Sequence, residues 1–186
     1  MSANNTKRLF TFEECLRMAE VGILAPDERV ELIAGEIVVM SPIGPRHGVA
    51  VDRTNRAMIQ LAGDKAIVRT QGTVVLDRFA APQPDIALLR PKDDEYITKN
   101  PAAEDIFLLI EVADSSLDYD TTTKLGLYAI LGIHEYWVAD LQNRRLLVHS
   151  EPKGDKYSIS RELHPGDSVA PDLLPDCSIS VDLIVP

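Results

Sequence analysis

The segment Ile106–Ala113 constrains the fold of this chain more than any other part of the sequence. It reads Ile-Phe-Leu-Leu-Ile-Glu-Val-Ala, a nearly continuous apolar run. Such a run is typical of a strand that is buried on both faces of a sheet. Glu111 interrupts it near its end, and a buried carboxylate without a partner is strongly unfavourable. We therefore expect a metal or a basic side chain beside Glu111, unless the strand emerges into solvent there.

A second carboxylate has a similar setting at Asp85. The pair Pro84-Asp85 opens an apolar segment, for which we predict a strand over 85–89. Three further Pro-Asp pairs lie in loop-like contexts, at Pro26-Asp27, Pro171-Asp172 and Pro175-Asp176. Only the pair at Asp85 begins a strand and precedes a second strand that ends in a carboxylate. Asp85 and Glu111 are therefore predicted to form one acidic, metal-binding site.

The rest of the pattern predicts an α/β or α+β domain. A capping box at Thr11 and Glu14 predicts a helix over about 11–20. Two apolar runs, 30–33 and 36–40, flank Ala34-Gly35 and predict a β-hairpin. Further helices are expected at about 47–61 and 121–131, and further strands at 67–71, 74–76, 135–140, 145–150, 157–160 and near 179–184. This order predicts a mixed β-sheet flanked by helices, preceded by an N-terminal helix and a β-hairpin.

Length and composition indicate one domain. The chain has 186 residues, of which 45% are hydrophobic. We expect residues 9–186 to form a single domain and the polar residues 1–8 to be a disordered tail rather than a signal peptide. No apolar run approaches the ~20 residues that span a bilayer. Cys15 and Cys177 have no metal-ligand partners at short spacing, so both are predicted to be reduced thiols of a cytoplasmic protein.

The net charge of −10 argues against a generic nucleic-acid-binding protein. Such proteins neutralise phosphates with a basic surface. An acidic chain can still contain a local basic patch, and cations bound in an acidic site can supply positive charge where a phosphate lies. Any nuclease activity of this chain therefore depends on one of these two arrangements.

Lys124 has an unusual position for a lysine. It falls in the first or second turn of the helix expected at 121–131, where the helix dipole disfavours a cation. Pairing with carboxylates would explain this position, and a solvent-facing side chain is the alternative. Tyr128 lies four residues further on and shares the same helix face.

Several motifs together resemble the Uma2 family of restriction-endonuclease-like proteins, within the PD-(D/E)xK nuclease superfamily. The motifs lie at residues 30–37, 69–71, 84–87, 109–116 and 124–140. Each is weak alone, but their order and spacing are specific, and they cover most of the chain from Phe10 to Tyr157. The resemblance implies a restriction-endonuclease-like fold and an endonuclease that hydrolyses DNA phosphodiester bonds with Mg²⁺ or Mn²⁺. A homodimer would suit the cutting of both strands of a duplex.

The resemblance also implies roles for individual residues. Asp85 and Glu111 would bind the metal, with the carbonyl of Val112 as a further ligand. Glu31 would supply an additional acidic group, so that the expected catalytic set is Glu31, Asp85, Glu111 and Lys124. The residues expected to line the pocket are His47, Gln71 and Tyr128.

One position departs from the superfamily pattern. The lysine expected two residues after Glu111 is Ala113 here. Residue 113 would share the face of Glu111 in a strand, so a lysine there would point into the site. Lys124 resembles a migrated replacement. It would orient or help to deprotonate the attacking water, or neutralise charge on the phosphate.

Two functions of other classes stay open from the sequence. One is a catalytically inactive module that binds nucleic acid or protein, which the net charge favours. The other is a structural subunit of an oligomer, with Tyr136 and Trp137 at an interface. The core of a strand is the favoured place for these two aromatic residues.

Overall fold

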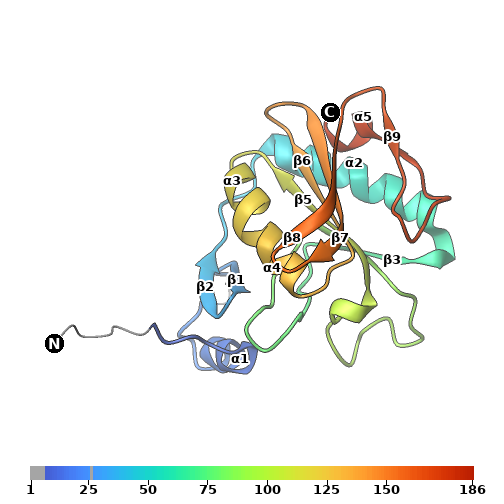
Figure 1. Cartoon of the computed structure of the whole chain (residues 1–186). Helices are drawn as coiled ribbons and strands as arrows, with labels where there is room; N and C mark the ends of the chain where they lie inside the picture. The colour runs from blue at the N-terminus through green and yellow to red at the C-terminus, as the bar shows by residue number, and fades with distance from the viewer. Residues whose placement is uncertain (1–6, 26) are drawn as a thin grey trace.

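A six-stranded mixed sheet forms the centre of the protein (Figure 1). The computed structural model describes residues 7–25 and 27–186, so the expected tail 1–8 lies mostly outside the described residues. The strands, in their order across the sheet, are β3 (Ile67–Thr70), β4 (Ile86–Leu89), β5 (Ile106–Ala113), β6 (Glu135–Asp140), β7 (Arg145–Lys153) and β8 (Lys156–Leu163). β5 and β6 are parallel, and the other neighbouring strands are antiparallel.

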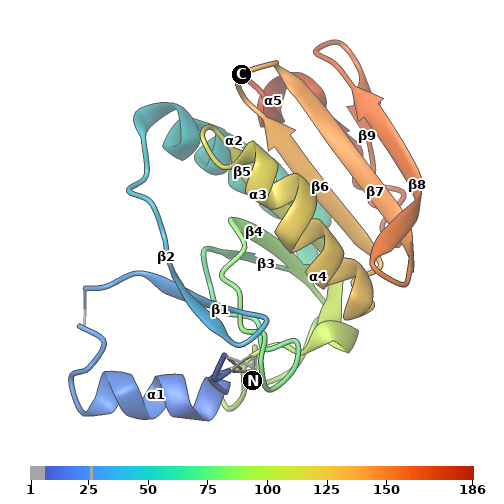
Figure 2. The ribbon, with the colours of Figure 1, turned by 60° about the vertical axis from the view of Figure 1, so that its left-hand side comes forward.

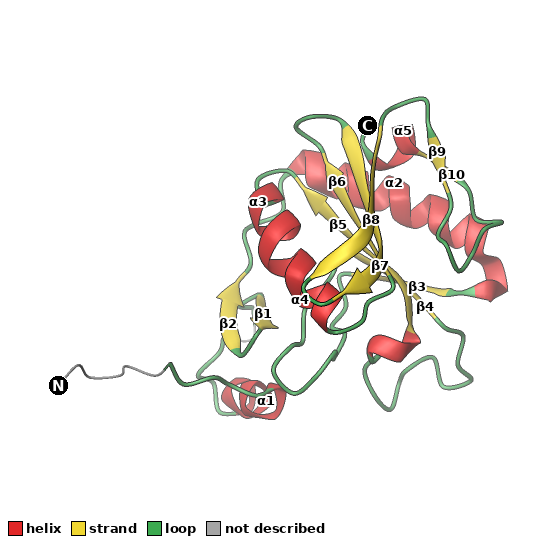
Figure 3. Cartoon of the chain, in the orientation of Figure 1, coloured by secondary structure: helices red, strands yellow, loops and turns green. Residues whose placement is uncertain are grey.

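Helices cover both faces of this sheet (Figures 2 and 3). The long helix α2 (Pro45–Ala62) packs on one face. The opposite face is covered by a continuous helical segment made of α3 (Leu117–Tyr119), a π-helical turn (Asp120–Lys124) and α4 (Leu125–Ile130). The sheet is therefore buried on both sides, as the apolar run of β5 predicts.

The alternation of side chains along β5 decides which groups meet which helix. Leu108, Ile110 and Val112 pack in the apolar cluster that contains residues of α2. Leu109 and Ala113 pack in the cluster that contains residues of α4. Side chains two residues apart share a face of the sheet. Glu111 therefore points to the α4 side.

The N-terminal helix and hairpin stand beside the main sheet (Figure 2). α1 (Phe12–Glu20) begins at the predicted capping box of Thr11. The strands β1 (Val30–Ile33) and β2 (Glu36–Val39) are joined by Ala34 and Gly35, both with positive φ. Two such residues form the type of turn that matches the twist of a hairpin. Both elements confirm the prediction.

A short bridge attaches the hairpin to the body of the domain. Leu32 pairs with Ala81 in an isolated antiparallel bridge. The backbone N–H of Gly35 donates to the carbonyl of Phe79 at 2.7 Å. These bonds hold the hairpin against the segment that leads into β4. This placement brings β1 close to the start of β4.

The strand predicted at 74–76 is wrong. The N–H groups of Val74 and Val75 donate to the carbonyls of Pro82 and Pro101. A proline can accept but cannot donate, so these bonds cannot continue as a ladder. The segment is a loop. The neighbouring strand predicted at 85–89 begins one residue later, because Asp85 lies outside β4.

The helix predicted at 121–131 begins four residues earlier, at Leu117. Ser116 stands before it, but its hydroxyl donates to Asp120 instead of capping the helix. Lys124 therefore lies at the end of the π-helical turn and not in the first turns. The helix dipole therefore does not disfavour a cation at Lys124, because that effect fades beyond the first turn.

Smaller corrections concern the element ends and the C-terminal segment. α2 begins at Pro45, two residues before the expected start. β7 and β8 confirm the closing hairpin and are longer than predicted. Near the C-terminus only β10 (Ile179–Ser180) is a strand, paired with β9 (Ser168–Val169). The chain then turns into the short helix α5 (Val181–Ile184) where a strand was expected.

Tyr136 and Trp137 are fully buried in β6. Their proposed place at a subunit interface is therefore wrong, and they belong to the core, one on each face of the sheet. Cys15 and Cys177 are both free thiols, as predicted. Among residues 7–25 and 27–186, no helix combines the length and the apolar character needed to cross a membrane.

Candidate active site

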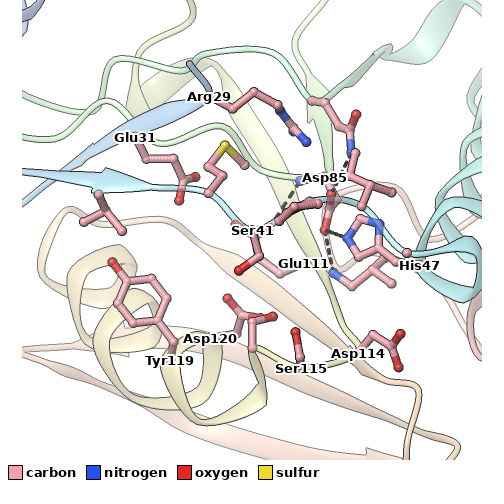
Figure 4. Close-up of a pocket in the computed structure, with 18 of the residues that line it drawn as sticks. Arg29, Glu31, Ser41, His47, Asp85, Glu111, Asp114, Ser115, Tyr119 and Asp120 are labelled. Atoms are coloured by element: carbon pink, nitrogen blue, oxygen red, sulfur yellow. Dashed lines mark hydrogen bonds and ion pairs between the residues drawn. The ribbon is translucent and has the colours of Figure 1, made fainter. Parts of the chain in front are cut away.

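A cavity of about 470 Å³ lies where the hairpin, the start of α2 and the ends of β4 and β5 meet (Figure 4). Helical residues of α3 and the π-helical turn close it on the remaining side. Its lining includes all four residues of the expected catalytic set and both His47 and Gln71. Tyr128 is the exception, because it does not line the cavity and is fully buried behind it.

The register between β4 and β5 brings Asp85 and Glu111 together. Ile86 of β4 pairs with Ile110 of β5, so the preceding residue of β4 faces the following residue of β5. The ladder between the two strands ends there, because β4 begins at Ile86. The backbone N–H of Asp85 approaches Glu111 Oε2 at 3.4 Å. Both carboxylates are buried, at 7% and 4% exposure.

The carboxylate of Asp85 is held by three donors. His47 Nε2 lies 3.0 Å from Oδ2, and the backbone N–H of Val112 donates to the same oxygen at 2.9 Å. Gln71 donates to Oδ1 at 3.2 Å. Burial by itself raises the pKa of Asp85, but His47 and these hydrogen bonds outweigh it and leave the pKa lowered. Asp85 is therefore an anion with a fixed orientation.

Glu111 faces the helical side of the site. Lys124 Nζ and the hydroxyl of Tyr128 both donate to Glu111 Oε1, each at 2.9 Å. Burial raises the pKa of Glu111 well above its ordinary value, against the attraction of Lys124, and the nearby carboxylates of Asp85 and Asp120 add to the rise. The remaining oxygen, Oε2, has only the long contact with the N–H of Asp85.

Lys124 joins the hairpin to the sheet. Its Nζ donates to Glu31 Oε1 at 3.0 Å as well as to Glu111, and its side chain is 5% exposed. Glu31 also accepts from the backbone N–H of Gln83 at 2.8 Å. Burial opposes the charge on Lys124, but Glu111 and Glu31 outweigh it and leave the pKa of Lys124 raised. Lys124 is therefore a permanent cation at neutral pH.

The donor set at this place suits a hard cation. Glu111 Oε2 and Asp85 Oδ1 keep free acceptor capacity, as their contacts show. The N–H of Val112 points toward Asp85, and in a strand the carbonyl of the same residue points to the same side, where β4 has ended. Oxygen ligands of this kind, with the remaining positions filled by water, are what Mg²⁺ prefers.

This set contains only two acidic side chains. Within the described part of the chain, no group of three or more His, Cys, Asp or Glu residues is arranged to hold a metal ion. Mg²⁺ is commonly bound by one or two carboxylates together with substrate phosphates and water. The two carboxylates and the carbonyl of Val112 thus fit such an ion.

Sequence comparison identifies the family. Residues 12–182 match the Uma2 family, described as "Putative restriction endonuclease". The chain belongs to the Uma2 family. No curated protein matches the chain in sequence.

A solved structure has the same fold as this Uma2 chain. It is described as a "putative nuclease belonging to DUF820 from Anabaena variabilis ATCC 29413". The TM-score is 0.74, and the match covers 94% of this chain and 97% of that chain. At 17% sequence identity the likeness concerns the fold alone. It confirms the nuclease-like mixed sheet with flanking helices that the Uma2 resemblance implies.

Sequence reasoning missed one buried carboxylate of the Uma2 site. Asp120 lines the cavity and is 3% exposed, and it accepts a hydrogen bond from Ser116 at 2.6 Å. Burial raises its pKa to about 6, although Lys124 and Ser116 oppose the rise. The feature of the sequence that could have identified Asp120 is its position in the acidic stretch that follows β5. That stretch is helical from Leu117, and this turns Asp120 inward.

The second missed residue of the Uma2 site is Arg29, directly before β1. It is half-buried, lines the cavity and extends over it from the hairpin side (Figure 4). His47 also lines the cavity. Burial lowers the pKa of His47, but Asp85 outweighs burial and leaves the pKa raised. The charge of Arg29 opposes that increase. Arg29 lies immediately before the first Uma2-like motif, and that position was the only signal in the sequence.

Proposed function

We propose that this protein is a metal-dependent endonuclease that hydrolyses phosphodiester bonds in DNA. One observation carries the proposal. Asp85, Glu111 and Lys124 come from three separate segments and line one cavity. Glu111 lies within hydrogen-bond distance of both the backbone N–H of Asp85 and Lys124 Nζ. Membership of a family described as a restriction endonuclease supports the same chemistry.

Asp85, Glu111 and the carbonyl of Val112 would hold Mg²⁺ or Mn²⁺. When bound, such an ion supplies a water of lowered pKa and stabilises the charge that develops on the phosphate. The protein keeps the ligands oriented. His47, Gln71 and the N–H of Val112 fix the Asp85 carboxylate through the three bonds described above.

Lys124 acts as a charge-neutralising group in this proposal. Its pKa is raised by two carboxylates, so it cannot take a proton from water at neutral pH. Of the roles that the sequence leaves open for it, deprotonation of the water is therefore disfavoured. Lys124 instead keeps Glu111 in place and offsets the charge of the acidic cluster.

The assay is nicking of supercoiled plasmid DNA in Mg²⁺ or Mn²⁺. We expect Glu111→Gln and Asp85→Asn to lower the rate by at least a hundredfold, because each removes a charged metal ligand. Asp64→Asn is the matched control, since Asp64 is exposed, lies outside the cavity and makes no side-chain hydrogen bond with any described residue. Cleavage at equal rates by Glu111→Gln and wild type would exclude the proposal.

A second candidate is a module that binds nucleic acid or protein without cutting it. One observation favours it: Asp85 already has three hydrogen-bond donors within the chain, so it has no need of a metal. Calorimetric titration with Mn²⁺ separates the two candidates. Heat of binding that disappears in Glu111→Gln supports the nuclease, and the lack of any binding by wild type supports the module.

For a nuclease that cuts both strands, we also propose a homodimer. Two-fold symmetry would present one cavity to each strand of a duplex. Light scattering in solution measures the mass directly. A species of one chain, 20.5 kDa, at assay concentration would exclude the dimer.

A further inference from the structure

Arg29 lies on the same side of the hairpin as Glu31. The two residues are two positions apart, so in extended backbone their side chains share a face. Both line the cavity. The carbonyl of Arg29 accepts from the N–H of Met40 at 2.9 Å, and this bond fixes the start of the hairpin through the backbone alone. The side chain of Arg29 extends over the cavity (Figure 4), and this backbone hydrogen bond does not involve it.

The basic side chains that line the cavity differ in whether they are already paired. Lys124 is buried and bonded to both Glu31 and Glu111. His47 lies against Asp85. Arg29 makes no ion pair and no side-chain hydrogen bond with any residue that the structure describes.

The lack of pairing is unexpected, given the carboxylates around Arg29. Five acidic residues line the same cavity: Glu31, Asp85, Glu111, Asp114 and Asp120. The nearest in sequence, Glu31, is instead bonded to Lys124 and to the N–H of Gln83. Asp114 Oδ1 lies 3.7 Å from Arg46 Nη1. The hairpin therefore presents a guanidinium whose donors are available to a ligand.

The geometry points to Arg29 as the group that binds a non-bridging oxygen of the substrate phosphodiester. A guanidinium has five N–H donors in a planar fork that matches phosphate oxygens. Arg29 and Asp85 line the same cavity (Figure 4), so a phosphate bound at the metal ligands would lie in the space that the guanidinium also faces. This inference rests on the proposed nuclease function. Arg29 would also supply the local positive charge that a chain of net charge −10 needs to hold a nucleic acid.

The test compares Arg29→Gln with Arg17→Gln. Arg17 is exposed on α1, lies outside the cavity and has no side-chain partner among the described residues, so both variants change the net charge equally. Cleavage of a short DNA duplex in Mn²⁺ is followed at several salt concentrations. We expect kcat/KM to fall about tenfold or more in Arg29→Gln, as loss of a charged hydrogen bond predicts, and by less than about twofold in Arg17→Gln.

The salt dependence distinguishes a phosphate contact from a structural role. Removing one phosphate contact should reduce the slope of log kcat/KM against log salt by about 1. Arg29→Lys should keep the wild-type slope, because the charge stays, while losing part of kcat/KM, because the fork is lost. The urea midpoint of Arg29→Gln should equal that of wild type.

The outcomes separate this inference from the function on which it rests. If wild type cleaves DNA and Arg29→Gln behaves like Arg17→Gln in rate and salt slope, Arg29 is not the phosphate-binding group. If wild type cleaves no DNA in Mg²⁺ or Mn²⁺, the proposed function fails and this inference fails with it.

Discussion

Lys124 Nζ donates to Glu111 Oε1 at 2.9 Å, although the two residues belong to different elements and stand 13 positions apart. The helical segment 117–130 follows β5 directly and packs on the face of the sheet to which Glu111 points. A lysine from this helix can therefore reach the place that a lysine at position 113 would have filled. Residue 113 itself is a fully buried alanine in the apolar cluster.

Loss of the Lys124 charge should destabilise the fold. Lys124→Met leaves Glu31 and Glu111 buried without their cation, and breaking a buried pair typically costs about 3–5 kcal/mol. Urea unfolding followed by the fluorescence of Trp137, the single tryptophan, measures this loss. Adding Glu31→Gln should restore part of it, because one unpaired charge is removed. A cost below about 1 kcal/mol for Lys124→Met would contradict the pairing.

Two buried tyrosines form a matched pair for the hydrogen bond to Glu111. Tyr128 donates to the Glu111 carboxyl group at 2.9 Å, whereas Tyr136 donates to the backbone carbonyl of Asp120 at 3.1 Å. Both are fully buried. Tyr128→Phe should cost about 1.5–3 kcal/mol of unfolding free energy and Tyr136→Phe about 1, because a bond to a charged group is stronger. Equal costs would indicate that Glu111 is uncharged at the pH of the measurement.

The ion that we propose for the site should stabilise the folded protein. Ligands that bind the folded state alone raise the unfolding free energy by about 2.7 kcal/mol at 100 times their Kd. Thermal unfolding in Mn²⁺ and in a chelator should therefore differ for wild type and for Asp64→Asn. Glu111→Gln should show no difference. A shift of the same size in Glu111→Gln would place the ion elsewhere.

Glu135 should make the stability depend on pH far from the active site. Burial raises its pKa to about 7, against hydrogen bonds from the N–H of Asp172 and from Trp137 Nε1. A raised pKa means that the folded state binds the proton more tightly than the unfolded state. The unfolding free energy should therefore fall as the pH rises from about 4.5 to about 7, by up to about 3 kcal/mol.

Urea unfolding of wild type and Glu135→Gln across this pH range isolates the contribution of Glu135. The variant has no titrating group at this position, so the difference between the two curves should change with pH only in that window. A difference that is constant from pH 4 to pH 8 would show that Glu135 has an ordinary pKa.

Alanine substitutions at two glycines, Gly35 in the hairpin turn and Gly22 after α1, compare the cost of backbone strain with the cost of steric overlap. Gly35 and Gly22 both have positive φ, at 78° and 76°. A Cβ at Gly35 would lie 2.7 Å from Leu9 Cβ, whereas a Cβ at Gly22 would meet nothing within 4 Å. Gly22→Ala should cost about 1 kcal/mol from strain, and Gly35→Ala should cost clearly more because Leu9 must move. Equal thermal shifts would show that Leu9 moves away freely.

The local elements were predictable where one segment determined its own structure. The bounds of β5 follow from an apolar run that is typical of a doubly buried strand. The capping box of Thr11 and the Ala34-Gly35 turn fix α1 and the hairpin through contacts a few residues apart. The start of the helix at Leu117 was missed, although Ser116 stands at the N-cap position, where its hydroxyl donates to Asp120 instead of capping the helix.

For the candidate site, the sequence by itself determined its two central carboxylates. Asp85 and Glu111 stand out because each interrupts or opens an apolar strand, and that pattern is local. Only the tertiary structure decided their partners. Glu31 meets Lys124 across 93 residues, and Arg29 lines the same cavity without a partner among the described residues. Such pairings depend on how the hairpin and the helix dock on the sheet, and this docking is set by packing between segments that no short stretch of sequence contains.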